Sequence, residues 1–73
     1  MTAPLAFFHI GTKAVNIAEI SHWWVAPGAP DGPALCICMR NGKQVNFDKT
    51  DGGGDGYSAE KHLLSFIDRV GRQ

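Results

Sequence analysis

The sequence predicts a small α+β protein: an antiparallel β-meander of four to five strands with one C-terminal amphipathic helix packed on one face. Three observations predict this fold. Short segments rich in β-branched and aromatic residues are separated by turns that contain glycine or proline. Asn41-Gly42 lies between two of these segments. A glycine-rich loop then leads to a final segment whose apolar residues recur with a helical period.

The length and composition describe one globular domain, residues 1–73. Seven Lys and Arg residues balance seven Asp and Glu residues, so the basic excess that is typical of duplex-binding proteins is absent. With 44% hydrophobic residues the chain is expected to fold rather than to be disordered. A chain this short buries only about 60% of its unfolded surface, so we expect its core to be supplemented by a partner subunit.

The charges are unevenly distributed. Between residues 1 and 30 only Lys13 and Glu19 are charged, while twelve of the fourteen charged residues lie from Asp31 onward. We expect a second copy of the chain to cover part of this weakly charged N-terminal half.

The chain is expected to be cytoplasmic, without a membrane partner. It has no run of ~18 apolar residues that could span a bilayer. The apolar run 3–10 lacks the charged start of a signal peptide. Cys36 and Cys38 are therefore expected to be free thiols.

Three strands are expected in the first part of the chain. Leu5–Ile10 and Ala14–Ile17 are joined by the glycine-containing turn Gly11–Lys13, which is a hairpin pattern. Ser21–Ala26 forms a third strand that ends at Pro27, because proline cannot donate to a ladder and restricts the residue before it.

The central hairpin joins Leu35–Arg40 to Lys43–Asp48 through Asn41-Gly42, for which we expect a type I′ turn of two residues. Because facing residues share a side of a sheet, this register predicts the composition of both faces. One face would carry Cys36, Cys38, Val45 and Phe47, and the other Leu35, Ile37 and Met39 beside Gln44, Asn46 and Asp48.

The C-terminal helix is expected to begin with Ser58 as its N-cap and to end at Gly71. His62 lies at the edge of its apolar stripe and is expected to be a boundary residue. The stripe itself consists of Ala59, Leu63, Phe66, Ile67 and Val70.

One helix can cover only one side of the sheet, so the other side is the expected interface. Adjacent residues on a strand point to opposite faces, and therefore one of Trp23 and Trp24 must point outward. An uncovered apolar patch on a small domain favours self-association. We predict a homodimer or larger homo-oligomer, with a further protein partner as an alternative occupant. The predicted interface residues are Trp23, Trp24, Leu35, Ile37 and Met39.

No catalytic or metal-binding pattern is found. Cys36 and Cys38 do not have the Cys-x2-4-Cys spacing of zinc sites. Asp48, Asp51 and Asp55 lie in a glycine-rich loop that lacks the ligand spacing of an EF-hand. Two Ser–His combinations occur without a recognisable nucleophile signature. We therefore expect a protein that is not an enzyme and needs no metal or cofactor, and we keep metal or calcium binding through the cysteines or the Asp loop as a third hypothesis behind the two functions below.

The first functional hypothesis is a non-catalytic interaction or scaffold module that self-associates through its apolar sheet face. The alternative is a single-stranded nucleic-acid-binding protein, because an exposed aromatic side chain on a sheet with nearby cations can stack and neutralise unpaired nucleotides. Its expected cationic contacts are Lys13, Arg40, Lys43 and Lys49.

Segments Val15–Ile20 and Leu35–Val45, followed by the capped helix from Ser58 onward, resemble the small FlbD-type proteins of bacterial flagellar operons. The resemblance covers most of the chain from Phe8 to Val70. It implies a bacterial, non-enzymatic accessory protein and assigns no site residue.

Overall fold

The computed structural model describes residues 6–71, and Leu5 of the first predicted strand lies outside them. The predicted fold is confirmed: five antiparallel strands are followed by one C-terminal helix. Two short 3-10 turns, η1 and η2, lie before β3 and after β5. The elements are β1 (Phe7–Ile10), β2 (Lys13–Asn16), η1 (Ile17–Glu19), β3 (Ile20–Ala26), β4 (Ala34–Met39), β5 (Gln44–Phe47), η2 (Lys49–Asp51) and α1 (Gly56–Gly71).

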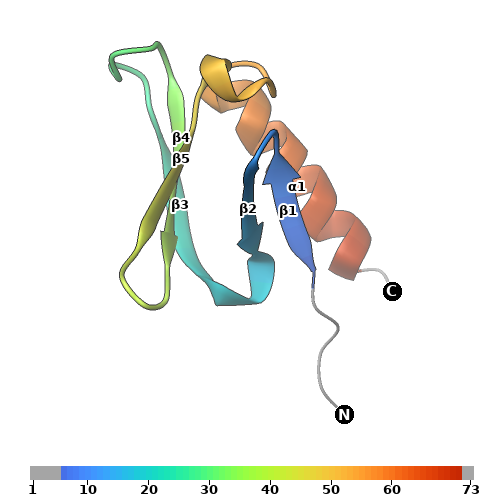
Figure 1. Cartoon of the computed structure of the whole chain (residues 1–73). Helices are drawn as coiled ribbons and strands as arrows, with labels where there is room; N and C mark the ends of the chain where they lie inside the picture. Colours follow the sequence, from blue (N-terminus) through green and yellow to red (C-terminus); the bar gives the residue numbers. More distant parts are fainter. Residues whose placement is uncertain (1–5, 72–73) are drawn as a thin grey trace.

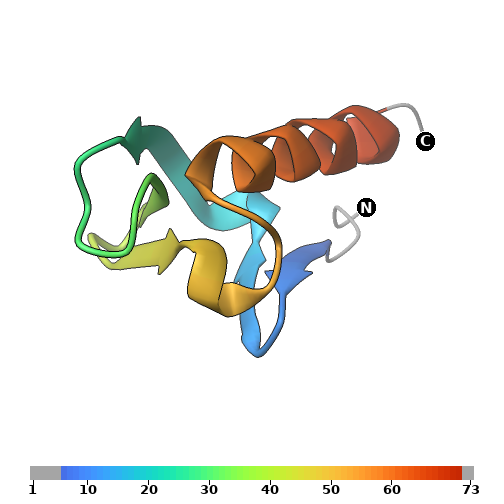
Figure 2. The ribbon, with the colours of Figure 1, turned by 90° about the horizontal axis from the view of Figure 1, so that it is seen from above.

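The strands form two sheets, a β1–β2 hairpin and a three-stranded sheet of order β3-β4-β5. Every strand pairs only with a neighbour in sequence, which is the connectivity of a meander. Figure 1 shows helix α1 and the β1–β2 hairpin on the same side of the three-stranded sheet, and Figure 2 shows this arrangement from above. We call that side of the sheet the covered face and the opposite side the open face.

The core lies between the covered face, α1 and the β1–β2 hairpin. Leu35, Ile37 and Phe47 of the sheet and Leu63 of the helix are all completely buried. Phe8 of β1 closes the core with an edge-to-face contact to Phe47, at 5.7 Å between ring centroids. Edge-to-face geometry is favourable because the positive edge of one ring meets the negative face of the other.

The predicted register of the central hairpin is wrong by one residue. Leu35 pairs with Phe47 and Ile37 with Val45, so these four apolar side chains share the covered face. A one-residue change of register moves every side chain of a strand to the other face. The cysteines of β4 therefore lie opposite Gln44 and Asn46 on the open face.

The β4–β5 turn explains the register. Within this turn Gly42 has a positive φ of 91°, whereas Asn41 does not, since among the described residues only glycines have a positive φ. A type I′ turn needs a positive φ at both central residues, so it is excluded here. The Gly42 N–H donates to the Met39 carbonyl at 3.0 Å, and the Asn41 side chain accepts from the Lys43 N–H at 2.9 Å. Such a three-residue loop with glycine in the left-handed region is the next most common hairpin. This loop permits the observed register, in which Phe47 is completely buried and Val45 is partly buried against the core.

Strand β3 contains a β-bulge at Ser21. Ile20 pairs with Met39 and His22 with Cys38, so Ser21 is an extra residue on β3. The bulge places both Ile20 and Trp23 on the covered face, although they are three residues apart.

Helix α1 begins two residues before the predicted N-cap Ser58. Asp55 caps it instead, because its side chain accepts from the Ser58 N–H at 3.0 Å and its carbonyl from the Ala59 N–H at 2.9 Å. Gly56, the first helical residue, lies so close to β4 that a Cβ would be 2.6 Å from the Ala34 carbonyl carbon. The predicted apolar stripe is confirmed, with Ala59 and Leu63 buried.

Within residues 6–71, no helix combines the length and apolar character required to cross a bilayer.

Candidate functional site

The open face is the side of the three-stranded sheet opposite α1 and the β1–β2 hairpin, and its exposure is uneven, because Trp24 is 42% exposed whereas Ala34 and Cys36 are buried. Its side chains follow from the register of the three strands. They are His22, Trp24 and Ala26 of β3, Ala34, Cys36 and Cys38 of β4, and Gln44 and Asn46 of β5. None of these eight residues is Lys, Arg, Asp or Glu. The open face is therefore a surface of neutral side chains.

The two adjacent tryptophans have opposite roles. Trp23 lies on the covered face, where its indole N–H donates to the Glu60 carboxylate of α1 at 3.1 Å. Trp24 points to the open face and is 42% exposed. The His22 ring stacks on Trp24, with 5.7 Å between ring centroids and 22° between ring planes. Trp24 is thus the outward tryptophan that strand alternation required.

The predicted interface set divides between the two faces. Leu35 and Ile37 are completely buried in the core and are not available to a partner, which corrects the expectation that they lie on an uncovered face. Met39 and Trp23 also pack against the core and are half-buried. The cause is the hairpin register, since a two-residue turn would have placed Leu35 and Ile37 opposite polar residues. Of the five predicted residues, only Trp24 presents a large exposed side chain.

Gln44 and Asn46 lie on the open face, as predicted, but beside the cysteines of β4 and not beside Leu35 and Ile37. Gln44 donates to the Asn46 side-chain oxygen at 2.8 Å, and both residues are exposed. The alternation of polar Gln44 and Asn46 with apolar Val45 and Phe47 is the signal that could have found the correct register, because it matches a half-buried strand.

The cysteines are free thiols on the open face. Cys36 is buried and Cys38 is half-buried. Each thiol is near a backbone carbonyl, Cys36 near that of Ala34 at 3.8 Å and Cys38 near that of Met39 at 3.7 Å. In the part of the chain that the structure describes, no three His, Cys, Asp or Glu side chains gather closely enough to hold a metal ion.

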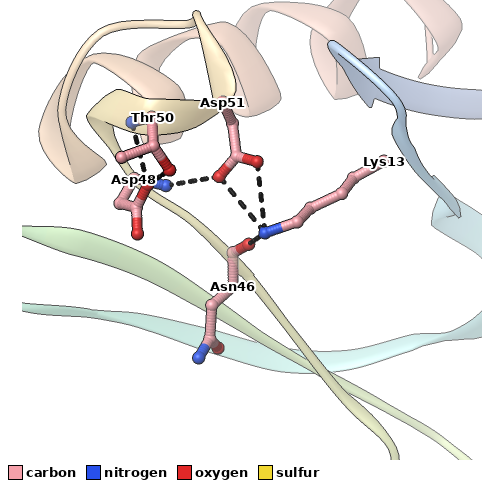
Figure 3. Close-up of polar contacts among 5 residues, drawn as sticks. All are labelled: Lys13, Asn46, Asp48, Thr50 and Asp51. Carbon is pink, nitrogen blue, oxygen red and sulfur yellow. Dashed lines mark hydrogen bonds and ion pairs between the residues drawn. The ribbon is translucent and has the colours of Figure 1, made fainter. Parts of the chain in front are cut away.

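The four predicted nucleic-acid contacts do not form one groove. Lys13 of β2 is partly exposed, but its ammonium group is engaged within the protein: it donates to the Asn46 carbonyl at 2.6 Å and pairs with the Asp51 carboxylate at 3.2 Å (Figure 3). Arg40 and Lys43 flank the β4–β5 turn and are exposed. Lys49 lies beyond the other end of β5, in η2.

The Asp-rich segment after β5 is an organised turn. The Asp51 carboxylate accepts from the Asp48 N–H at 2.9 Å, while the Asp48 carboxylate accepts from the Thr50 N–H at 2.9 Å and from the Thr50 hydroxyl (Figure 3). These bonds form a capping box. The Thr50 hydroxyl and N–H stabilise the charged carboxylate and so hold the pKa of Asp48 below its ordinary value. The carboxylates of Asp48 and Asp51 therefore already have hydrogen-bond or ion-pair partners within the protein.

Ser21 and His22 form a Ser–His contact that is exposed to solvent. The Ser21 hydroxyl and His22 Nδ1 are 3.1 Å apart, and both residues are exposed. His62, the other histidine considered above, is exposed on α1. Nucleophilic catalysis requires a base oriented by a third group within an enclosed site, and an exposed pair on a strand does not provide that enclosure.

A second surface lies between β1 and α1. It is an open groove of about 500 Å³. Strand β1 and its turn supply one wall, from Phe7 to Gly11, and the helix supplies His62, Ser65, Phe66 and Arg69. No local pattern in the sequence indicates this groove, because it depends on how the β1–β2 hairpin docks beside the helix.

Comparison with protein-family models, curated proteins and solved structures gives no significant match to this chain.

Proposed function

We propose that the protein is a non-catalytic interaction module that self-associates through the open face, with two open faces packed against each other in a homodimer. The observation that supports this proposal is the exposure of Trp24 on a sheet face without charged side chains. Aromatic side chains are enriched in interface cores and charged ones are depleted there. Neutral faces also avoid the repulsion that like charges would cause when two identical surfaces meet.

The size of the open face sets the expected strength. Three strands with a spacing of ~4.8 Å and about five residues each, at ~3.3 Å per residue, make a patch far smaller than the ~800 Å² per partner of a stable interface. We therefore expect a reversible dimer with a dissociation constant of about 10 to 100 µM. A contact between identical faces closes at two subunits, so a larger assembly would need a second surface.

Light scattering during size-exclusion chromatography, from about 10 µM to about 1 mM protein, tests the proposal over the expected range. The average mass should rise with concentration toward twice the monomer mass. Trp24→Ser should remain monomeric because it removes the only large exposed apolar side chain of the open face. Tyr57→Ser is the matched control, since Tyr57 is 48% exposed on α1 and lies outside the open face.

A monomeric mass for the unmodified protein over the whole range would refute self-association. Equal association by Trp24→Ser and the unmodified protein would show that another surface is used.

A specific observation favours the second candidate function, binding of single-stranded nucleic acid. The stacked rings of His22 and Trp24 lie on a three-stranded antiparallel sheet, which is an arrangement on which unpaired bases can stack. Arg40 and Lys43 at the β4–β5 turn are the cations available to its phosphates.

Tryptophan fluorescence distinguishes the two candidates. In a Trp23→Phe background only Trp24 emits, so an oligothymidylate of about eight nucleotides should quench that emission if bases stack there. With two phosphate contacts, the logarithm of affinity should fall with the logarithm of salt concentration with a slope of about −1.4. No quenching at low salt would leave self-association as the supported function.

The proposed location is the cytoplasm, because free Cys36 and Cys38 suit a reducing compartment. A bacterial origin and the likeness to FlbD-type proteins remain predictions.

A further inference from the structure

The groove between β1 and α1 has the free edge of a strand along one side. Strand β1 pairs only with β2, and the Ile17 N–H donates to the Ala6 carbonyl at 3.0 Å. Hydrogen bonds in an antiparallel pair alternate along the strand, so Ala6, Phe8 and Ile10 direct their backbone groups toward β2. The N–H and C=O groups of Phe7 and His9 consequently point away from it.

Within residues 6–71, the backbone hydrogen bonds made beyond helices and strands include none from Phe7 or His9. A row of unpaired backbone groups is a template for another strand. The groove of about 500 Å³ that is lined by β1 and α1 lies beside this strand.

The helix presents one consistent set of side chains to the groove. His62, Ser65, Phe66 and Arg69 are spaced i, i+3, i+4 and i+7, which places them on one helical face. Phe66 lies 6.0 Å from Phe8 between ring centroids, so the two rings contact each other. The Arg69 guanidinium lies 5.9 Å from the Phe66 ring and remains exposed.

The charge of the groove selects the occupant. Among the described residues that line it, Arg69 is charged, two are histidines and none is Asp or Glu. An occupant with carboxylate side chains is therefore complementary. A second copy of this chain does not supply such a strand, because no Asp or Glu lies in β1 to β5.

We propose that the groove binds an extended acidic segment of another protein, which adds as a further strand to the free edge of β1. The backbone of the segment pairs with Phe7 and His9, and its alternate side chains face α1. One carboxylate pairs with the Arg69 guanidinium, and the next inward side chain is apolar and packs on Phe66.

The spacing along α1 gives the length of the segment. The seven helical steps from His62 to Arg69 span about 10.5 Å, whereas inward side chains of a strand recur every ~6.6 Å. A segment of about five residues thus reaches from Arg69 to His62 with three inward side chains. The preferred order is carboxylate, apolar and carboxylate, the last accepting a hydrogen bond from His62.

Amide chemical shifts of ¹⁵N-labelled protein test the proposal with a defined probe. The probe is the acetylated and amidated pentapeptide Glu-Thr-Val-Thr-Glu. Shifts should occur at Phe7, His9 and the groove side of α1. Replacing both glutamates of the peptide by lysine should weaken binding about tenfold or more, because the charge pair with Arg69 becomes repulsive.

Two charge reversals separate the groove from a general electrostatic effect. Arg69→Glu should weaken the acidic peptide about tenfold or more and strengthen the lysine peptide. Arg40→Glu makes the same charge change at the β4–β5 turn and should leave both affinities unchanged within about twofold. Equal losses in the two variants would overturn the proposal.

Backbone methylation tests the strand addition itself. One peptide is N-methylated at its second and fourth residues, and another at its first, third and fifth. Alternate amides of an added strand face β1, so one methylated peptide should bind and the other should not. Equal binding of both would overturn strand addition.

Other occupants appear as distinct outcomes. Shifts at Phe7 and His9 on dilution without peptide would indicate a second copy, and stronger shifts there with the oligothymidylate would indicate nucleic acid. Either result would overturn the proposal. Trp24→Ser should not change peptide affinity, so this inference and the proposed self-association can fail independently.

Discussion

Side chains of the covered face and of the open face alternate along the same three strands, but the two sets differ in burial. On the covered face, Leu35, Ile37 and Phe47 are completely buried against α1 and the β1–β2 hairpin. On the open face, Trp24 is 42% exposed, and Gln44 and Asn46 bond to each other.

The difference shows how a 73-residue chain divides the side chains of its sheet between a buried core and a more exposed surface. Apolar area removed from water stabilises the fold in proportion to that area, so the covered face carries most of the stability of the sheet. On the open face, Ala34 and Cys36 are also buried, but the large side chain of Trp24 keeps much of its area in water. Substitutions at neighbouring residues on opposite faces should therefore differ sharply.

The largest contrast is expected at the end of β5, between Phe47→Ala and Asn46→Ala. Removing the buried Phe47 ring should cost about 3–5 kcal/mol, a large part of the ~4–11 kcal/mol expected for a domain of this length. Asn46→Ala loses one exposed hydrogen bond and should cost less than about 1 kcal/mol. Urea unfolding followed by far-UV circular dichroism measures both, and equal costs would contradict the division between faces.

The next contrast tests the close packing of the first turn of α1 against β4. In Gly56→Ala, the new Cβ would lie 2.6–2.7 Å from backbone atoms of Ala34 and Leu35. Backbone cannot move as easily as a flexible side chain, so a loss of about 1–3 kcal/mol is expected. Gly71→Ala is the control, because no atom lies within 4 Å of its new Cβ and alanine favours helix by up to about 1 kcal/mol. Thermal unfolding should show opposite shifts for the two variants.

The adjacent tryptophans provide a smaller contrast. Trp23→Phe removes the indole N–H that donates to Glu60 at 3.1 Å and should cost about 1 kcal/mol. Trp24→Phe keeps an aromatic ring on the open face and should change the free energy of unfolding by less than about 0.5 kcal/mol. Combining Trp23→Phe with Glu60→Ala, which removes the acceptor, in a double-mutant cycle measures the coupling between the two side chains. Additive losses would show that Trp23 contributes by packing alone.

The smallest effect is expected outside the sheet, in the turn that leads from β5 toward α1. Thr50→Val removes the hydroxyl that holds the pKa of Asp48 down, so this pKa should rise toward its ordinary value. Thr50→Ser keeps the hydroxyl and should leave the pKa low. Carbon-13 NMR titration of the carboxylate measures both variants, and an unchanged pKa in Thr50→Val would contradict the assignment.

The sign of the associated stability effect follows from the lowered pKa. The unfolded chain binds this proton more readily than the folded chain does. The contribution of Asp48 is therefore present above its unfolded pKa of ~3.9 and is lost as pH falls through the folded value. Because the Asp48 side chain is solvated, we expect a minor change in acid stability.

Local patterns predicted most elements because the period of apolar residues and the turn residues act within a single segment of the chain. The apolar stripe of α1 follows from its period of 3.6 residues, and the position of the β4–β5 turn follows from Asn41-Gly42. The start of the helix was misplaced because Asp55 and Ser58 are both good N-caps. The Gly56 N–H donates to the carbonyl of Pro33, the residue before β4, at 2.8 Å. This tertiary contact places the first helical turn at Gly56.

The sequence by itself determined the class of the fold, the order of its elements and the fact that one tryptophan faces outward. Those properties depend on residue type and period along a single segment. Only the tertiary structure decided the hairpin register, the identity of Trp24 as the outward residue and the groove beside β1. Each of these depends on which distant segments pack together, because burying Val45 and Phe47 with Leu35 and Ile37 outweighs the local preference for a two-residue turn.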